Sequence, residues 1–149
     1  MHRMDMEKTM SIFYYGLIEG SDHMFVEYNP NPTGRRVEDC SIRAVAKALD
    51  IDWETAFLLL ANNAFQMGDL PHSNSVIGSV LRQHNFYRQS LPDRCPDCYT
   101  VRDFAREHPM GTYVLFCNNH VVCVKDGRIF DTWDSSELSP NFYWYRKDE

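Results

Sequence analysis

The hydrophobic pattern of the chain changes once, from a helical period to a strand period, and this order limits the folds available to it. Between residues 40 and 107 apolar side chains recur every three to four positions, whereas from residue 113 they form short runs between turn residues. We expect helices over residues 40–49, 53–67, 74–83 and 100–107. We expect strands over residues 113–116, 120–124, 129–133 and 142–145. Helices followed by an antiparallel sheet predict the α+β class.

The composition is that of one globular domain. The chain has 149 residues, of which 44% are hydrophobic, and this is enough to build a single core. A Gly-Ser-Asp break after the methionine-rich start predicts an N-terminal extension over residues 1–23 and a domain over residues 24–149. The net charge of −6 argues against nucleic acid or an anionic membrane as a partner. Five cysteines, with no secretion signal and no apolar run of membrane length, predict a cytoplasmic protein with free thiols.

Cys40 lies where a helix is expected to begin. Asp39 is a favourable N-cap residue, and apolar side chains follow at helical spacing at Ile42, Val45 and Leu49. The N-terminus of a helix carries a partial positive charge, which favours a thiolate and lowers the pKa of a thiol from about 8.5. Buried cysteines elsewhere usually act as small hydrophobic side chains. The position therefore indicates that Cys40 is a nucleophile.

A hairpin near the C-terminus brings an imidazole and a carboxylate together. The Asp126-Gly127 pair predicts a two-residue turn in which Lys125 faces Arg128. In that register His120 and Asp131 lie on one face of the sheet as diagonal neighbours. We therefore expect contact between these two side chains.

Together these residues have the chemistry of a catalytic triad. A carboxylate beside an imidazole fixes its tautomer and favours the imidazolium, and the imidazolium in turn favours a nearby thiolate. The pattern predicts Cys40 as nucleophile, His120 as the proton-transferring base and Asp131 as the group that orients His120.

The same residues resemble the motifs of the papain-like cysteine peptidases. In that superfamily a Cys preceded by Asp opens the first core helix, a later His opens a strand, and an Asp lies on the next strand. The chain is similar to small bacterial and phage-associated members, including bacteriocin-processing peptidases, over roughly residues 29–133. Asp39-Cys40-Ser41 also resembles the "DCS" of the NlpC-type cell-wall peptidases, although the glycines that follow it there are absent here.

The resemblance implies a fold and an activity. The fold would be papain-like, with N-terminal helices and the nucleophile helix packed on a C-terminal antiparallel sheet. The activity would be thiol-dependent hydrolysis of a peptide or isopeptide bond in a peptide or protein substrate, with no cofactor. Specificity, hydrolysis as against acyl transfer, and oligomeric state stay open.

The resemblance leaves the oxyanion donor open. Papain-like enzymes usually have a glutamine shortly before the nucleophile, and none precedes Cys40. Asn31 is the first substitute, because its amide could join the backbone N–H of Cys40 in binding an oxyanion. Tyr28 is the second, because NlpC-type enzymes use an upstream tyrosine. A turn role for Asn31 before Pro32 is the alternative.

Zinc is the main rival interpretation. Two pairs of candidate ligands lie at a spacing typical of structural zinc ribbons: Cys95, Cys98, Cys117 and His120. A helix is expected between the two pairs, where a ribbon would have strands. The zinc interpretation also gives no role to Cys40 or Asp131. The alternative function is thus a zinc-stabilised or catalytically inactive papain-like module that binds a protein partner.

Overall fold

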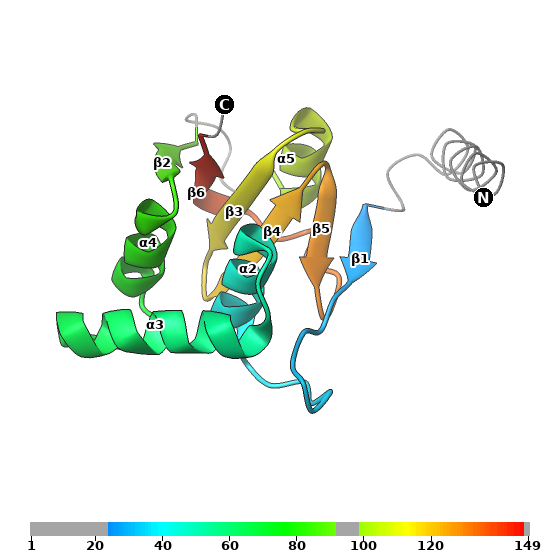
Figure 1. Ribbon diagram of the computed structural model, residues 1–149. Helices are drawn as coiled ribbons and strands as arrows, with labels where there is room; N and C mark the ends of the chain where they lie inside the picture. The colour runs from blue at the N-terminus through cyan, green and yellow to red at the C-terminus, as the bar shows by residue number, and fades with distance from the viewer. Residues whose placement is uncertain (1–23, 92–98, 148–149) are drawn as a thin grey trace, which may run out of the picture.

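The computed structural model describes residues 24–91 and 99–147, which form one six-stranded sheet with helices on both faces (Figure 1). The helices are α2 (Cys40–Leu49), α3 (Trp53–Met67), α4 (Asn74–Gln83) and α5 (Val101–Glu107). The strands are β1 (Phe25–Glu27), β2 (Phe86–Ser90), β3 (Thr112–Cys117), β4 (His120–Lys125), β5 (Arg128–Asp131) and β6 (Pro140–Arg146). The α+β class is confirmed. The proposed extension over residues 1–23 lies outside the described residues.

The four C-terminal strands β3 to β6 pair antiparallel as predicted, but the whole sheet is mixed, because earlier segments add a strand at each edge. The strand order is β1-β5-β4-β3-β6-β2, and β1 pairs with β5 in parallel while the other pairs are antiparallel. The segment before α2 therefore supplies one edge strand, and the segment after α4 supplies the other. Both edges of the four C-terminal strands gain hydrogen-bond partners in this way, which covers backbone groups that an open edge would expose.

The two-residue turn between β4 and β5 has the predicted register. Lys125 pairs with Arg128 across the Asp126-Gly127 turn, and both turn residues have positive φ, at 50° and 76°. Positive φ at both positions is the signature of a type I′ hairpin. Because the strands are antiparallel, the first residue of β4, His120, lies at the same end of the sheet as the last residue of β5, Asp131.

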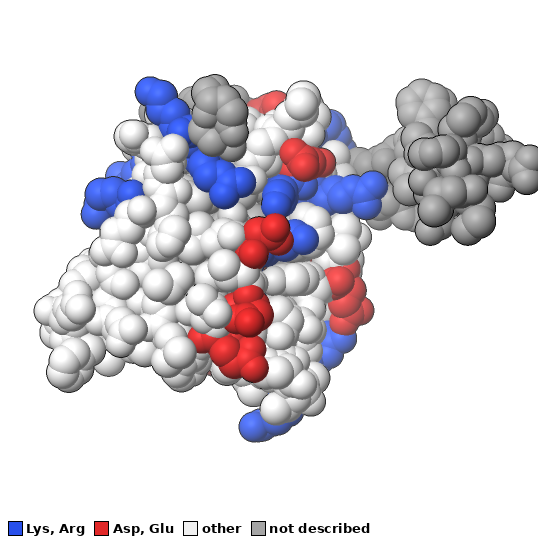
Figure 2. Space-filling model, in the orientation of Figure 1, with Lys and Arg blue, Asp and Glu red and all other residues white. Residues whose placement is uncertain are grey.

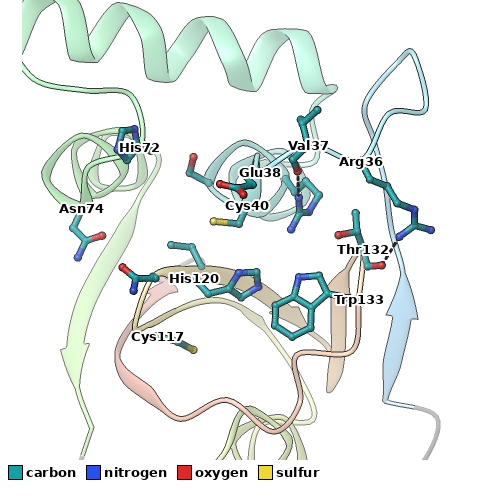
Figure 3. Close-up of a pocket in the computed structure, with 14 residues that line it drawn as sticks. Arg36, Val37, Glu38, Cys40, His72, Asn74, Cys117, His120, Thr132 and Trp133 are labelled. Atoms are coloured by element: carbon teal, nitrogen blue, oxygen red, sulfur yellow. Dashed lines mark hydrogen bonds between the residues drawn. The ribbon is translucent and has the colours of Figure 1, made fainter.

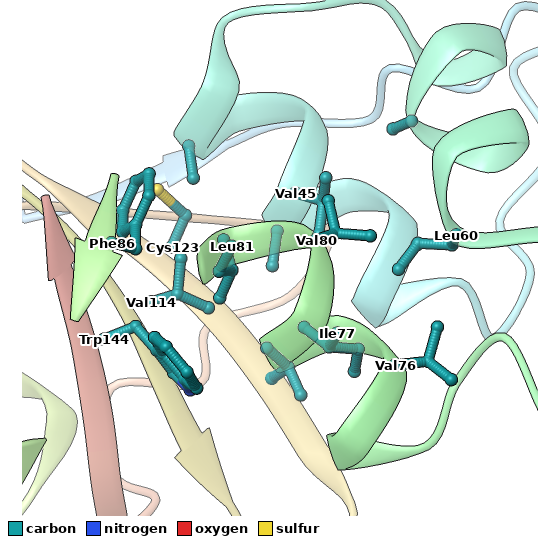
Figure 4. Close-up of a cluster of buried hydrophobic side chains, with 14 of the residues drawn as sticks. Val45, Leu60, Val76, Ile77, Val80, Leu81, Phe86, Val114, Cys123 and Trp144 are labelled. Carbon is teal, nitrogen blue, oxygen red and sulfur yellow. The ribbon is translucent and has the colours of Figure 1, made fainter. Parts of the chain in front are cut away.

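Helices α2, α3 and α4 cover one face of the sheet with a buried apolar cluster. Val45 of α2 is completely buried, and small side chains at Ala46 and Ala48 are also completely buried. Small residues let a helix lie close against a sheet, so that packing is dense. Figure 4 shows Val45 and the α4 side chains beside Val114 and Cys123 of the sheet. This packing fixes the position of α2 over β4.

Helix α5 covers the opposite face. A capping box between Thr100 and Asp103 begins the helix. Phe104 is completely buried and contacts Tyr113 and Tyr143 edge to face, with ring centroids 5.2 and 4.8 Å apart. Both faces of the sheet are thus packed, and Cys40, His120 and Asp131 lie at its end.

The outer face of α3 is apolar and exposed. Phe57, Leu58 and Phe65 are 45, 58 and 88% exposed, and most of the surface over this helix is uncharged in Figure 2. Among residues 24–91 and 99–147, no helix is both long enough and apolar enough to cross a membrane.

Candidate active site

The beginning of α2 differs from the sequence prediction in one respect. Helix α2 starts at Cys40 with Asp39 as its N-cap residue, as expected, but the Asp39 side chain makes no capping hydrogen bond. The Asp39 carboxylate instead pairs with Arg43, one turn along the helix, and accepts a 2.8 Å hydrogen bond from Trp53 Nε1. Asp39 therefore does not cover the first N–H groups of α2, which lie beside Cys40.

Cys40 lines an open cavity of about 700 Å³ at the end of the sheet. Figure 3 shows the Cys40 side chain above the His120 ring, with His72 and Asn74 on one side and Trp133 on the other. The cavity is lined by Arg36, Val37, Glu38, Cys40, Ser41, Arg43, His72, Asn74, Cys117, Asn119, His120, Val121, Thr132 and Trp133. The cavity thus extends to both sides of the thiol.

Asp131 holds His120 and is itself fully hydrogen-bonded. Its Oδ2 lies 2.7 Å from His120 Nε2 and accepts a 2.7 Å hydrogen bond from Ser135. Its Oδ1 accepts 2.8 Å hydrogen bonds from Arg43 Nη2 and from the backbone N–H of Thr132. Burial alone would raise the pKa of Asp131, but hydrogen bonds from His120 and Ser135, with the charges of His120 and Arg43, lower it. The carboxylate is therefore ionised and fixed in orientation.

The thiol and the imidazole shift each other's pKa. Burial would raise the pKa of Cys40, but hydrogen bonds from His120 and the Val121 backbone, with the charges of His120 and Arg43, lower it. Burial would lower the pKa of His120, but hydrogen bonds with Asp131 and Cys40 raise it to about 9. Since Asp131 occupies Nε2, Nδ1 is the ring nitrogen left for Cys40. These opposite shifts favour a thiolate–imidazolium pair near neutral pH.

The structure does not bring Asn31 to the cavity. Asn31 Oδ1 accepts hydrogen bonds from the backbone and the hydroxyl of Thr33, at 2.9 and 2.8 Å, so the side chain closes its own turn. Tyr28 packs against Phe130 with the Lys47 ammonium over its ring, and it does not line the cavity either. The prediction of either residue as oxyanion donor is therefore not supported by the geometry.

The zinc set is only partly visible. Cys95 and Cys98 lie outside the described residues. Cys117 and His120 are paired across the β3–β4 turn, but the Nε2 of His120 is taken by Asp131. Residues 24–91 and 99–147 contain no group of three or more His, Cys, Asp or Glu side chains placed to hold a metal ion.

The sequence did not predict the two side chains, Arg43 and Ser135, that hold Asp131 together with His120. Arg43 contacts both Asp39 and Asp131, and only the first contact had a signal, since residues four apart on a helix are neighbours. Ser135 lies in the loop after β5, where no periodicity or motif distinguishes it. Its role depends on how that loop folds back on Asp131.

The site joins two parts of the chain that are distant in sequence: the start of α2, and the β4–β5 hairpin with His120 and Asp131 at its open end. Comparison of the chain with family models, with curated proteins and with solved structures finds no match. What the site does is therefore inferred from its own residues and their geometry.

Proposed function

We propose that the chain is a papain-like cysteine hydrolase that cleaves an amide bond, peptide or isopeptide, in a peptide or protein substrate. Cys40 is the nucleophile, His120 transfers the proton and Asp131 orients His120. The observation that carries the proposal is the 2.7 Å contact between His120 Nε2 and Asp131 Oδ2, with the Cys40 thiol above the same imidazole ring in one cavity (Figure 3). The order of the elements, with a nucleophile helix before the two strands that carry His and Asp, supports a papain-like arrangement.

Acylation begins from the ion pair. The Cys40 thiolate attacks the carbonyl carbon, forming a C–S bond and a tetrahedral oxyanion. When the intermediate collapses, the C–N bond breaks and His120 gives its Nδ1 proton to the leaving amine. The products of this half-reaction are the free amine and a thioester on Cys40, with His120 neutral.

Water completes the reaction. The neutral His120 takes a proton from a water molecule, which attacks the thioester carbonyl. The C–S bond breaks, the carboxylic acid leaves, and the thiolate–imidazolium pair is restored. Asp131 stays ionised throughout, because it stabilises the imidazolium without accepting its proton.

The start of α2 supplies a site for the oxyanion. The N–H groups of the first turn are not capped by Asp39, and they lie at the positive end of the helix beside Cys40. The sequence predicted that the Asn31 amide and the backbone N–H of Cys40 bind the oxyanion together. In this proposal the backbone N–H of Cys40 binds it without Asn31. The side-chain amides at the cavity wall belong to Asn74 and Asn119.

An activated ester tests the nucleophile without knowledge of the substrate. We expect p-nitrophenyl acetate to release nitrophenolate in a burst and to leave an acetyl group on Cys40, located by peptide mass spectrometry. Acetylation of lysines alone, with Cys40 unmodified, would contradict the proposal. A peptide library, also read by mass spectrometry, then tests amide cleavage, and acylation without cleavage would indicate an acyl transferase or an inactive module.

The role of His120 is tested by the pH dependence of Cys40 alkylation. In His120→Ala we expect a higher pKa of Cys40 and slower alkylation by iodoacetamide near pH 6, because the imidazolium is lost. Asp131→Asn should act in the same direction but more weakly, since the imidazole is retained. Circular dichroism controls for folding. Superimposable rate profiles in folded proteins would require withdrawal of the triad.

A further inference from the structure

A buried chain of polar contacts connects α3 to the triad. Trp53 Nε1, at the start of α3, donates to Asp39 Oδ2 at 2.8 Å, and Asp39 Oδ1 pairs with Arg43. Arg43 Nη2 then donates to Asp131 Oδ1 at 2.8 Å. The side chains of Arg43, Asp39 and Asp131 are only 4, 3 and 1% exposed. Such buried charges are expensive unless each has a partner, so their arrangement requires an explanation.

We propose that Arg43 is a positioning residue of the site, which fixes the Asp131 carboxylate so that Oδ2 faces His120. Asp39 and Trp53 in turn fix Arg43. The inference rests on the proposed function, because it assigns to Arg43 the orientation of the Cys40–His120 pair. It goes further, because it adds to the three proposed catalytic residues a series of contacts through Arg43 and Asp39 to Trp53 of α3.

The geometry explains why an arginine serves here. The last torsion of an aspartate is broad, so an unrestrained carboxylate can present either oxygen in many directions. Arg43 Nη2 and the Thr132 N–H hold Oδ1, and this leaves Oδ2 for His120 and Ser135. The planar guanidinium has N–H donors on both terminal nitrogens. Nη1 pairs with Asp39, and Nη2 pairs with Asp131. A lysine ammonium is a point charge and would not span both carboxylates in this fixed geometry.

The charge of Arg43 also favours the reactive state. Its guanidinium lies near enough to Cys40 and Asp131 to stabilise the anionic form of each. Loss of Arg43 would therefore weaken the site in two ways, by releasing Asp131 and by removing a positive charge near the thiolate. A purely structural residue would affect stability but would not shift the titration of Cys40.

The variants must separate positioning from folding. Arg43→Met alone would leave two buried carboxylates without their cation, and unfolding is a foreseeable result. The double variant Asp39→Asn/Arg43→Met removes one carboxylate together with the cation and nearly conserves side-chain size. Asp39→Asn alone is the matched control, because it retains the contact between Arg43 and Asp131. Arg43→Lys keeps the positive charge but loses the pair of terminal nitrogens that contact Asp39 and Asp131.

The experiment compares the rate of Cys40 alkylation by iodoacetamide against pH in these variants. Relative to Asp39→Asn, we expect the double variant to alkylate about tenfold more slowly near pH 6, as a rise of one pKa unit would cause. Arg43→Lys should also slow the alkylation of Cys40 near pH 6 relative to the wild type, but by less than tenfold. Circular dichroism and thermal melting confirm folding, and Arg43→Lys decides the question if the double variant does not fold.

Two results would overturn the inference. One is an identical pH profile of Cys40 alkylation for Asp39→Asn and the folded double variant. The other is a wild-type profile for Arg43→Lys, which would show that Arg43 contributes only its positive charge. His120→Ala in the same assay separates this failure from failure of the proposed function. If His120→Ala shifts the profile and the Arg43 variants do not, only the role of Arg43 is lost. If His120→Ala has no effect, the triad itself is wrong.

Discussion

Helix α2 has buried side chains toward both ends, but they are held by different forces. At the N-terminal end Asp39 and Arg43 form a network of ion pairs that continues to Asp131. At the other end Val45 and Ala48 are completely buried in an apolar cluster against the sheet. Apolar burial has no direction and fixes mainly where the helix lies. Charge-assisted hydrogen bonds are directional, so they fix how the Asp131 carboxylate points.

The cysteines of these two regions show the chemical consequence. Cys123 lies in the apolar cluster, is completely buried, and has its pKa raised by that burial to about 12. Burial also acts on Cys40, but there the hydrogen bonds from His120 and Val121, with nearby positive charges, lower the pKa. The same side chain therefore has a raised pKa in one region and a lowered pKa in the other, because only one region offers partners to the thiolate.

The largest expected effect concerns these thiols directly. At pH 7 we expect iodoacetamide to label Cys40 about 30-fold or more faster than Cys117 or Cys123 in the native protein. Both buried thiols have pKa values raised by burial to about 12, against a lowered value for Cys40. The larger thiolate fraction of Cys40 outweighs its weaker intrinsic nucleophilicity. Peptide mass spectrometry over a time course measures the rates, and equal labelling would remove the distinction between the two regions.

The apolar end of α2 is tested by Val45→Ala. We expect a loss of about 2 kcal/mol in the free energy of unfolding, from two buried methyl groups and the cavity that remains. The alkylation profile of Cys40 should not change, because the ionic network does not include Val45. Urea unfolding gives the first quantity. A shifted profile in the folded variant would show that the two ends are coupled.

The smallest expected effect is a difference in pH dependence of stability between wild type and Cys40→Ala. Above the lowered pKa of Cys40 and below about 9, the folded pair keeps one proton on His120. The unfolded wild type keeps one proton on the cysteine up to about pH 8.5, so the pair adds no pH dependence there. In Cys40→Ala, Asp131 still raises the pKa of His120. Stability should then fall as pH rises above about 6.5, by at most about 1.4 kcal/mol per pH unit.

Urea unfolding of both proteins at several pH values between 6.5 and 8.5 measures this difference. Other titrating groups are common to the two proteins and cancel in the comparison. Parallel pH dependences would indicate that Cys40 and His120 do not form an ion pair in the folded chain.

Local features were determined by the sequence itself. The bounds of α3 and α4 follow from the hydrophobic period and from capping residues at Asp52 and Ser73, whose side chains accept hydrogen bonds from backbone N–H groups. The β4–β5 register follows from the Asp126-Gly127 turn, and from it the contact of His120 with Asp131. These features depend on residues a few positions apart, so the sequence carries their full signal.

Contacts between distant segments were decided by the tertiary structure. Asp39 had a local option, to cap α2, but Arg43 and Trp53 draw its carboxylate away. Asn31 lies upstream of Cys40 as an oxyanion donor would, yet its turn places it away from the cavity. The parallel pairing of β1 with β5 and the contact of Arg43 with Asp131 join segments more than 80 residues apart. Which of several chemically possible partners a buried charge takes depends on the packing around it, and packing is a property of the whole fold.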